Sequence, residues 1–298
     1  MGTSWSVKLV SEKAVDGDAV QAGIQQQLDL VNGLMSNWDP QSEVSQFNRA
    51  SAGCYPISRH TFEVADVSMQ LAELSDGLFD VTVGPLIELW GFGTEFTADQ
   101  MPSQEQIDIA LQRVDHDFLS LSPGEWCKSI DGLFVNLSAT AKGYGVDLVA
   151  NFLEAEGFDR YLVEVGGEIR VAGSNLQDMP WRVGIEKPAD DSSNQLVQGV
   201  IDLNQGAVAT SGDYRNYFEV DGEVYSHVID PRIGYPIPHE LASVTVIHES
   251  ALWADGWATA LLAMGPDIGM RMVNAIGLRV FMVQRTANGY REITSDNW

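Results

Sequence analysis

The order of hydrophobic patterns along this chain is the strongest constraint on its fold. In the first half, apolar residues recur with the 3.6-residue period of amphipathic helices. In the second half, short apolar runs separated by turn residues predict strands. Strands and helices do not alternate as they do in a doubly wound parallel sheet. The sequence therefore predicts an α+β fold with mixed, mostly antiparallel sheets and flanking helices.

The same patterns predict individual elements. The predicted helices span residues 18–35, 58–74, 103–114, 139–156, a segment that carries Asp255 and Thr259, and 266–275. The predicted strands span residues 6–10, 161–165, 168–172, 181–185, 196–202, 217–220, 224–227, 243–247 and 279–283, with residues 209–214 between strands. No segment resembles a long linker, so residues 1–298 are expected to form one domain. Its helix-rich and strand-rich halves would form two lobes with a cleft between them.

The charge of the chain excludes some classes of partner. The formal net charge is −25, from 42 acidic and 17 basic residues. Such a surface repels nucleic acid and anionic lipid, so neither is expected to bind. No stretch approaches the roughly 20 apolar residues that a membrane-spanning helix needs. An anionic phosphate substrate would need local positive charge, which a bound metal ion can supply.

Neither the cysteines nor the start of the chain identifies a cellular compartment. Cys54 and Cys127 are too few for a disulfide framework, and neither belongs to a CxxC motif. One disulfide is compatible with the sequence, but two largely buried free thiols are expected. Residues 1–5 lack the basic and apolar segments of a signal peptide. A cytoplasmic protein and a mature form whose leader has been removed both fit.

Three residues carry most of the chemistry that the sequence suggests. Asp255 and Thr259 are four residues apart, so on a helix their oxygens lie on one face and suit Mg²⁺. His227 is suited to moving a proton near neutral pH. An Asp–Thr pair at this spacing is also common on exposed helix faces, and a single histidine in a strand is commonly structural. A metal and a base, without a zinc-type cluster or a common nucleotide-phosphate fingerprint, together favour phosphoryl chemistry.

Several further motifs occur in a fixed order. They are SNWDP at 36–40, SEVSQFN at 42–48, GLFDVTVGP at 77–85, LWGFG at 89–93, LSATAKGYGVD at 137–147, ATSGDY at 209–214, SHVIDPRIG at 226–234 and ADGWAT at 254–259. In this order the motifs closely resemble those of the ApbE family of flavin transferases. The resemblance covers essentially the whole chain.

The resemblance implies an activity. Members of the family transfer the FMN half of FAD to a threonine or serine hydroxyl of a partner protein, and AMP leaves. The implied partners are flavoprotein subunits of the sodium-pumping NADH:quinone reductase and RNF type. Some relatives instead hydrolyse FAD to FMN and AMP in a Mg²⁺-dependent reaction. Mg²⁺ is thus the implied cofactor and FAD the implied substrate.

The resemblance also assigns the metal ligands and the base. Mg²⁺ would be held by the Asp255 carboxylate, the Thr259 side chain and the backbone carbonyl of Ala141. His227 would accept the proton of the attacking hydroxyl, and Asp230 is a candidate to orient it. The alternative for Asp230, which precedes a proline, is simply to start a turn.

The family pattern places eight residues around FAD. They are Met1, Trp38, Phe79, Asp80, Val81, Ser138, Tyr144 and Ile229. The flat faces of Trp38 and Tyr144 suit stacking on a ring system, and Ser138 at a helix start suits a phosphate or ribose. Without the family, the two aromatic residues would be assigned to the core and Ser138 to a plain N-cap. Lys142 is the one cation of its motif and could meet phosphate or solvent.

The chain departs from the family pattern at three positions. Ala258 stands where many relatives carry an acidic metal ligand, so a single Mg²⁺ is expected. Asn136 replaces a frequent Asp, and Ile233 replaces a frequent Thr. A lipobox cysteine is also missing near the start, although many relatives are lipoproteins on the outer face of the inner membrane. The resemblance implies a periplasmic enzyme, anchored in its full-length precursor, while a cytoplasmic location stays open.

Three functions therefore compete. The first is a flavin transferase, the second a Mg²⁺-dependent FAD pyrophosphatase with water as the nucleophile, and the third a flavin-binding protein without turnover. The first two share every motif and cannot be separated by sequence. The presence of His227, Asp255 and Thr259 together favours an enzyme, because a binding protein needs no base.

Overall fold

A seven-stranded antiparallel sheet forms the centre of the protein. The computed structural model describes residues 2–93, 101–187, 197–213, 217–220, 223–237, 241–286 and 289–298. The strand order in the sheet is β1-β5-β6-β9-β14-β15-β16, and every neighbouring pair is antiparallel. These strands are β1 (Trp5–Leu9), β5 (Tyr161–Val165), β6 (Glu168–Ala172), β9 (Gln205–Gly212), β14 (Leu241–His248), β15 (Arg279–Thr286) and β16 (Gly289–Thr294). The predicted α+β class with mostly antiparallel sheets is confirmed.

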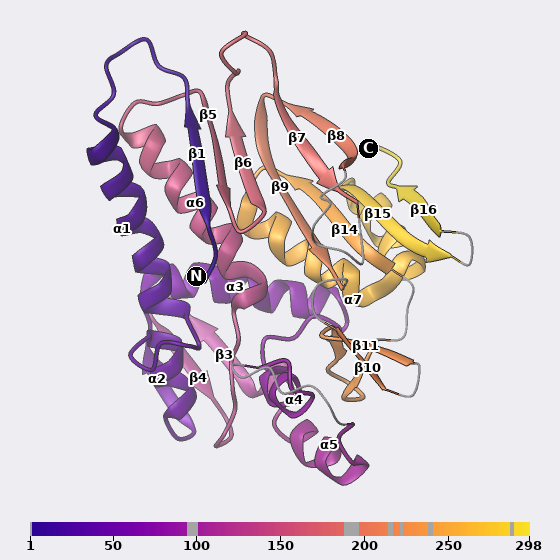
Figure 1. Cartoon of the computed structure of the whole chain (residues 1–298). Coiled ribbons are helices and arrows are strands. Elements are labelled where there is room, and N and C mark those ends of the chain that lie inside the picture. The colour runs from indigo at the N-terminus through magenta and orange to yellow at the C-terminus, as the bar shows by residue number, and fades with distance from the viewer. Residues whose placement is uncertain are drawn as a thin grey trace.

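Two long helices cover one face of this sheet (Figure 1). They are α6 (Ser138–Ala155) and α7 (Ala251–Ile276), and α1 (Gly17–Met35) packs against α6 from outside. α6 and α7 approach very closely at Gly143, where a Cβ atom would lie 2.1 Å from the Ala251 carbonyl oxygen. The close approach therefore requires glycine at position 143. It brings the start of α6 against the first turns of α7.

A hairpin covers part of the opposite face. β7 (Trp181–Glu186) pairs with β8 (Val197–Leu203). Alternate side chains of β7 are buried, which matches the period of a half-buried strand. Trp181, Val183 and Ile201 pack with Val171 of β6 and Val283 of β15 in one apolar cluster. The sheet is therefore buried on both faces at its centre.

The remaining elements lie at one end of the sheet (Figure 1). They are α2 (Glu43–Arg49), β2 (Gly53–Pro56), α3 (Arg59–Leu74), α4 (Gly84–Leu89), α5 (Gln104–Leu111), a short 3₁₀ helix (His116–Phe118), β3 (Leu119–Ser122), β4 (Glu125–Lys128), β10 (Tyr217–Val220), β11 (Glu223–Ser226), β12 (Ile229–Asp230) and β13 (Tyr235–Pro236). β2, β4 and β3 form a small antiparallel sheet in that order. The elements that were not predicted from the sequence are α2, β2, α4, the 3₁₀ helix, β3, β4, β9, β12, β13 and β16.

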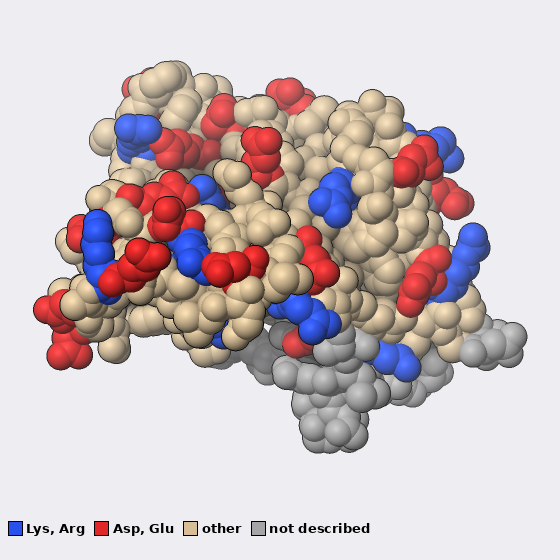
Figure 2. Space-filling model, turned by 90° about the horizontal axis from the view of Figure 1, so that it is seen from above, with Lys and Arg blue, Asp and Glu red and all other residues tan. Residues whose placement is uncertain are grey.

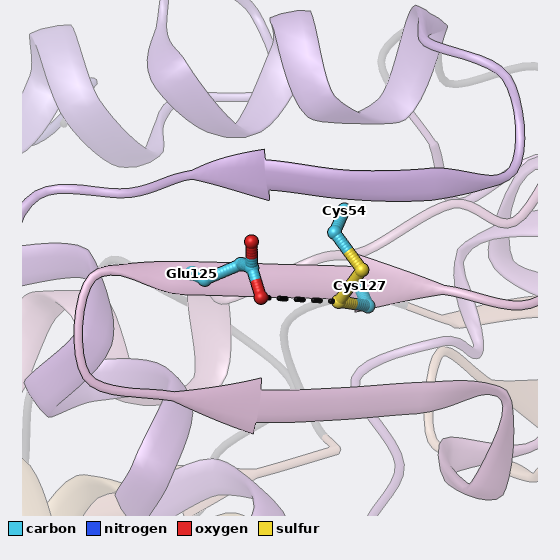
Figure 3. Close-up of side chains that lie close together, drawn as sticks. All are labelled: Cys54, Glu125 and Cys127. Atoms are coloured by element: carbon cyan, nitrogen blue, oxygen red, sulfur yellow. Dashed lines mark hydrogen bonds between the residues drawn. A yellow bond between two sulfur atoms is a disulfide. The ribbon is translucent and has the colours of Figure 1, made fainter.

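The two cysteines form a disulfide, and the prediction of two free thiols was wrong (Figure 3). Cys54 on β2 lies directly opposite Cys127 on β4, so the strand register brings the two sulfurs together. Their Cα atoms are 3.9 Å apart. Cys54 is exposed and Cys127 half-buried, so they are not the buried residues that were expected. Glu125 lies two residues before Cys127 on β4, on the same face of the strand.

Two further corrections concern secondary structure. Residues 209–214 were expected between strands, but β9 extends to Gly212 and is a central strand of the sheet. Its small residues allow α7 to pack directly on it. The two expected C-terminal helices form one element, α7, with a kink at Gly265 (φ 73°) before Pro266. Proline explains the break, because it lacks the N–H that continues a helix.

The surface agrees with the acidic composition. Figure 2 shows Asp and Glu side chains spread over one face, with Lys and Arg side chains among them and no continuous basic patch on the part of that face that is described. Of the helices in the described ranges, none combines the length and the apolar character that crossing a membrane requires.

Candidate active site

A cavity of about 990 Å³ brings together most of the residues that the sequence singled out. Its wall includes Trp38, Phe79, Asp80, Val81, Ser138, His227, Ile229, Asp255 and Thr259. These residues come from five separate segments of the chain, and the fold alone places them side by side. The volume is at the upper end of what small-molecule sites usually offer.

The position of Asp255 and Thr259 follows from how α7 begins. Asp147 of α6 accepts hydrogen bonds from the Ser250 hydroxyl (2.7 Å) and from the backbone N–H groups of Ala251 and Leu252 (3.0 Å each). A carboxylate there satisfies free donors at the helix start and stabilises the positive end of the helix dipole. The first turns of α7, and with them Asp255, are thus fixed against α6.

Oxygen atoms predominate around these two residues. The Asp255 Oδ2 atom accepts a hydrogen bond from the Gly143 N–H (2.9 Å), and the Thr259 hydroxyl lies 3.0 Å from the Ser211 hydroxyl. Ala141, the third predicted ligand, lies in the first turn of α6 two residues before Gly143 and is buried. This all-oxygen set is what Mg²⁺ prefers in proteins. The residues present therefore fit the metal that the resemblance implies.

Lys142 bridges two acidic side chains at this end of the cavity. Its ammonium group donates to Glu168 Oε1 and lies 3.6 Å from Asp255 Oδ1. Lys142, Glu168 and Asp255 all line the cavity, and among the described lining residues Lys142 is the only lysine or arginine. Glu168 and Asp255 are each 2% exposed. The second oxygen of Glu168, Oε2, is buried and has no hydrogen-bond partner among the described residues.

Burial and charge shift the pKa values of this cluster. Burial, together with the nearby Asp255 charge, raises the pKa of Glu168 to about 7, although Lys142 opposes the shift. Burial likewise raises the pKa of Asp255. For Lys142, burial acts against the charged form, but the two carboxylates outweigh it and raise the pKa of the ammonium group. Lys142 is therefore positively charged.

His227 lines the same cavity. It follows β11, is half-buried, and its ring centre is 6.3 Å from that of Phe92. Asp230 does not orient it, because both oxygens of Asp230 accept hydrogen bonds from the Arg232 side chain (3.0 and 2.8 Å). Asp230 Oδ1 also accepts from the Arg232 backbone N–H (2.9 Å), so Asp230 stabilises the turn before β13. The alternative assignment of Asp230 to a turn is the one that the structure supports.

Asp80 forms a second polar cluster in the same wall. Its Oδ1 atom accepts from the Thr82 backbone N–H (2.7 Å) and hydroxyl (2.6 Å). Its Oδ2 atom accepts from the His116 backbone N–H (2.9 Å) and lies 3.3 Å from the His116 ring. The hydrogen bond to Asp80 raises the pKa of His116, with burial opposing and the charges of Asp80, Asp117 and Asp115 adding to it.

The segment around Asp80 is tied to the start of α6. The Asn136 backbone N–H donates to the Val81 carbonyl oxygen (2.7 Å), and Asn136 Oδ1 accepts from the Ser138 N–H (2.9 Å). Asn136 thus holds Val81 and Ser138 in one wall of the cavity. An aspartate would accept the same hydrogen bond, which explains why asparagine is tolerated here. Trp38 is 64% exposed at the cavity, with a flat face available to a ligand.

Comparison with known proteins identifies the family. The sequence profile of the ApbE family matches residues 1–282. The FAD:protein FMN transferase of Vibrio cholerae is 41% identical over 302 aligned positions, which cover 100% of this chain and 89% of that protein. This chain belongs to the ApbE family.

Relatives and solved structures agree over the whole length. The FAD:protein FMN transferase of Escherichia coli K12 is 40% identical over 98% of this chain and 84% of its own. The solved structure of the flavin transferase ApbE from Vibrio cholerae superimposes with a TM-score of 0.91 at 40% identity, covering 100% of this chain and 95% of that one. The ApbE protein of Thermotoga maritima has a TM-score of 0.86 at 30% identity, covering 99% and 94%.

Not every residue of the ApbE pattern lines the cavity. Tyr144 is buried, and its hydroxyl donates to Glu63 (2.6 Å) and lies 2.7 Å from His60 Nδ1, both on α3. It is not among the lining residues, and its position agrees with the core alternative. Ala141 is not a lining residue either, and Met1 lies outside the described residues. Ala258 is fully buried in the apolar core, so α7 offers one carboxylate to the cavity.

The cavity also contains residues that sequence reasoning missed. Glu168 is the most informative, because it is buried, acidic and in contact with Lys142. Ser211 is the second, because its hydroxyl contacts Thr259. Glu168 directly follows the Gly166–Gly167 turn and begins β6. A single acidic residue at the start of a strand belongs to no sequence pattern that indicates a functional role. Ser211 belongs to the ApbE motif at 209–214, which the sequence marked without assigning a role.

Proposed function

We infer that the chain is an FAD:protein FMN transferase, as its ApbE relatives are named. One observation carries the inference: His227 lies in the wall of the same cavity as Asp255 and Thr259. A base and an oxygen-ligand set around one space are what transfer of a phosphoryl-linked group requires. The cavity also holds Trp38, Phe79, Asp80, Val81, Ser138 and Ile229, which the family pattern places around FAD.

Mg²⁺ would be held by the Asp255 carboxylate, the Thr259 hydroxyl and the Ala141 carbonyl. When bound, it would stabilise negative charge on the phosphate oxygens of FAD. Lys142 is placed to add a positive charge at the same end of the cavity. An otherwise acidic wall, with Glu164, Glu168 and Glu186 among its residues, needs this compensation before a pyrophosphate can enter.

The reaction then follows from the positions of these groups. His227 accepts the proton of a threonine or serine hydroxyl as its oxygen attacks the FMN-side phosphorus. A new phosphoester bond forms, the bond between that phosphorus and the bridging oxygen breaks, and AMP leaves. The protein substrate is proposed to be a flavoprotein subunit of the sodium-pumping NADH:quinone reductase or RNF type.

The disulfide favours a compartment. A Cys54–Cys127 bond persists in an oxidising environment and is rare in the reducing cytosol. We therefore propose a periplasmic location. A membrane anchor in the full-length precursor remains a proposal that rests on the family.

Intact mass spectrometry tests the transfer. The protein is incubated with FAD and Mg²⁺, with and without a threonine-containing fragment of a candidate flavoprotein subunit. A fragment that gains the mass of FMN minus water, with release of AMP, supports the transferase. Free FMN and AMP beside a series of unmodified fragments would instead show the pyrophosphatase, and intact FAD in all samples would contradict both. A fragment whose acceptor threonine is changed to alanine is the matched control.

A further inference from the structure

The carboxylate of Glu168 is unusual in the cavity wall because one of its two oxygens is buried and lacks a hydrogen-bond donor among the described residues. Its Oε1 atom accepts a hydrogen bond from Lys142, whereas Oε2 is buried and has no donor in the part of the chain that the structure describes. The side chain is 2% exposed, so bulk water does not compensate. A buried acceptor without a donor costs about 1–3 kcal/mol. A group that enters the cavity and donates a hydrogen bond would remove this cost.

The chemistry of that group is restricted. In its ionised form, which the adjacent Lys142 ammonium favours, the Glu168 carboxylate only accepts hydrogen bonds, so Oε2 cannot then bind the phosphate oxygens of FAD, which are acceptors too. Hydrated Mg²⁺ is a suitable donor, because it usually keeps several of its waters and polarises them. Glu168 also lies next to the predicted metal ligand, since Lys142 contacts both Glu168 and Asp255.

We propose that Glu168 is a positioning residue of the metal site, which accepts a hydrogen bond through Oε2 from a water molecule bound to Mg²⁺. Its Oε1 atom at the same time holds the Lys142 ammonium beside, rather than on, the Asp255 carboxylate. Carboxylates in this outer position orient the waters of a metal ion and tune its affinity. The inference rests on the proposed function, because it takes the metal site of the ApbE family as given.

Metal binding measured in the absence of FAD tests the role of Glu168. The probe is Mn²⁺, and the free ion is quantified by its electron paramagnetic resonance signal. We expect Glu168→Gln to weaken Mn²⁺ binding about 10- to 100-fold. Glu164→Gln is the matched control, since Glu164 also lines the cavity but its oxygens accept from the Gly167 N–H (2.9 Å) and the Ser6 hydroxyl (3.2 Å). Its Mn²⁺ affinity should stay within about twofold of that of the wild type.

A double-mutant cycle separates the direct role from an indirect one. Loss of the Glu168 charge would also let Lys142 move onto Asp255 and compete with the metal. In a Lys142→Met background that competition is absent, so a direct role predicts that Glu168→Gln still weakens Mn²⁺ binding at least fivefold. An effect that vanishes in this background, or equal affinity of the single variant and the wild type, overturns the proposal.

Two further results complete the test. If Glu168→Gln does not fold, Glu168→Asp keeps the charge but withdraws both oxygens, and it should also lower Mn²⁺ affinity. Unchanged Mn²⁺ affinity in Glu168→Asp would count against the proposal. Failure of the proposed function gives a different result, because the wild type itself would then bind no Mn²⁺ or would produce no AMP from FAD.

Discussion

Two acidic clusters lie in the wall of one cavity, and they differ in how their hydrogen bonds are satisfied. At the Asp80 end, Thr82 and the His116 backbone supply three donors at 2.6–2.9 Å, and the carboxylate has a protein partner on each oxygen. At the Asp255 end, one ammonium group contacts both Asp255 and Glu168, and the Gly143 N–H donates to Asp255. One oxygen of Glu168 has no partner among the described residues.

This difference in hydrogen bonding separates acidic residues that stabilise the fold from acidic residues that are available to a ligand. A carboxylate that is fully bonded to protein has little to offer a metal or substrate. The Asp80 carboxylate therefore shapes the wall. Among the described residues, the Asp255 end keeps one unsatisfied acceptor, Glu168 Oε2, which a cation-bound water or another hydrogen-bond donor can complete.

The largest expected effect follows from removing the carboxylate of α7. Asp255→Asn should lower transfer by about 10⁴-fold, because the only carboxylate ligand of the proposed Mg²⁺ is lost and a metal ion stabilises several kcal/mol of transition-state charge. Release of AMP from FAD at saturating Mg²⁺ measures the effect. The variant should unfold at nearly the temperature of the wild type. Full turnover that resists a chelator would contradict the metal assignment.

A smaller effect is expected at the base. His227→Ala should lower transfer by about 10³-fold, since general base catalysis contributes roughly 10²–10⁴. FAD binding, followed by quenching of flavin fluorescence, should survive. Rates are best compared at several pH values so that a shifted optimum is not mistaken for loss of the base. Wild-type activity in this variant would remove His227 from the mechanism.

A substitution at Asp80 should lower the stability of the fold and leave metal binding unchanged. Asp80→Ala leaves the Thr82 and His116 donors without their acceptor, so we expect a loss of about 2–4 kcal/mol in the free energy of unfolding. Urea denaturation measures it. Mn²⁺ affinity of the folded variant should be unchanged. A large loss of metal affinity with normal stability would reverse the roles assigned to the two ends.

The smallest effect is a pH dependence at the same end. Because the pKa of His116 is raised in the folded state, its stabilising effect is fully present below the unfolded value of about 6.5. The effect is lost as the pH rises through the folded value. The stability difference between the wild type and His116→Gln should therefore shrink from pH 5.5 to pH 8.5. A difference that grows with pH would contradict the ion pair with Asp80.

Much of this site could be predicted from local sequence motifs. The parts that were missed depend on contacts between segments that are distant in the sequence. Asp255, Thr259 and His227 belong to short motifs whose chemistry is visible in the sequence, and they do line one cavity. The disulfide was missed because it depends on the register between β2 and β4, which no local pattern reveals.

Two other misses have physical reasons of the same kind. β9 was missed because its central residues are small, and they are small so that α7 can pack on the strand. Glu168 was missed because its significance lies in a buried contact with Lys142, a residue 26 positions away. The helices α1, α3, α5 and α6 were predicted well, since their periodicity and their caps, such as the capping box of Ser103 and Gln106, are local.

The contrast between the two ends can be tested directly by locating a metal ion. Crystals grown with FAD and Mn²⁺ would show the ion by its anomalous scattering. We expect one strong peak bounded by the Asp255 carboxylate, the Thr259 hydroxyl and the Ala141 carbonyl, with a bound water facing Glu168 Oε2. A peak beside Asp80 and His116 in place of this one, or no peak at Asp255, would contradict it.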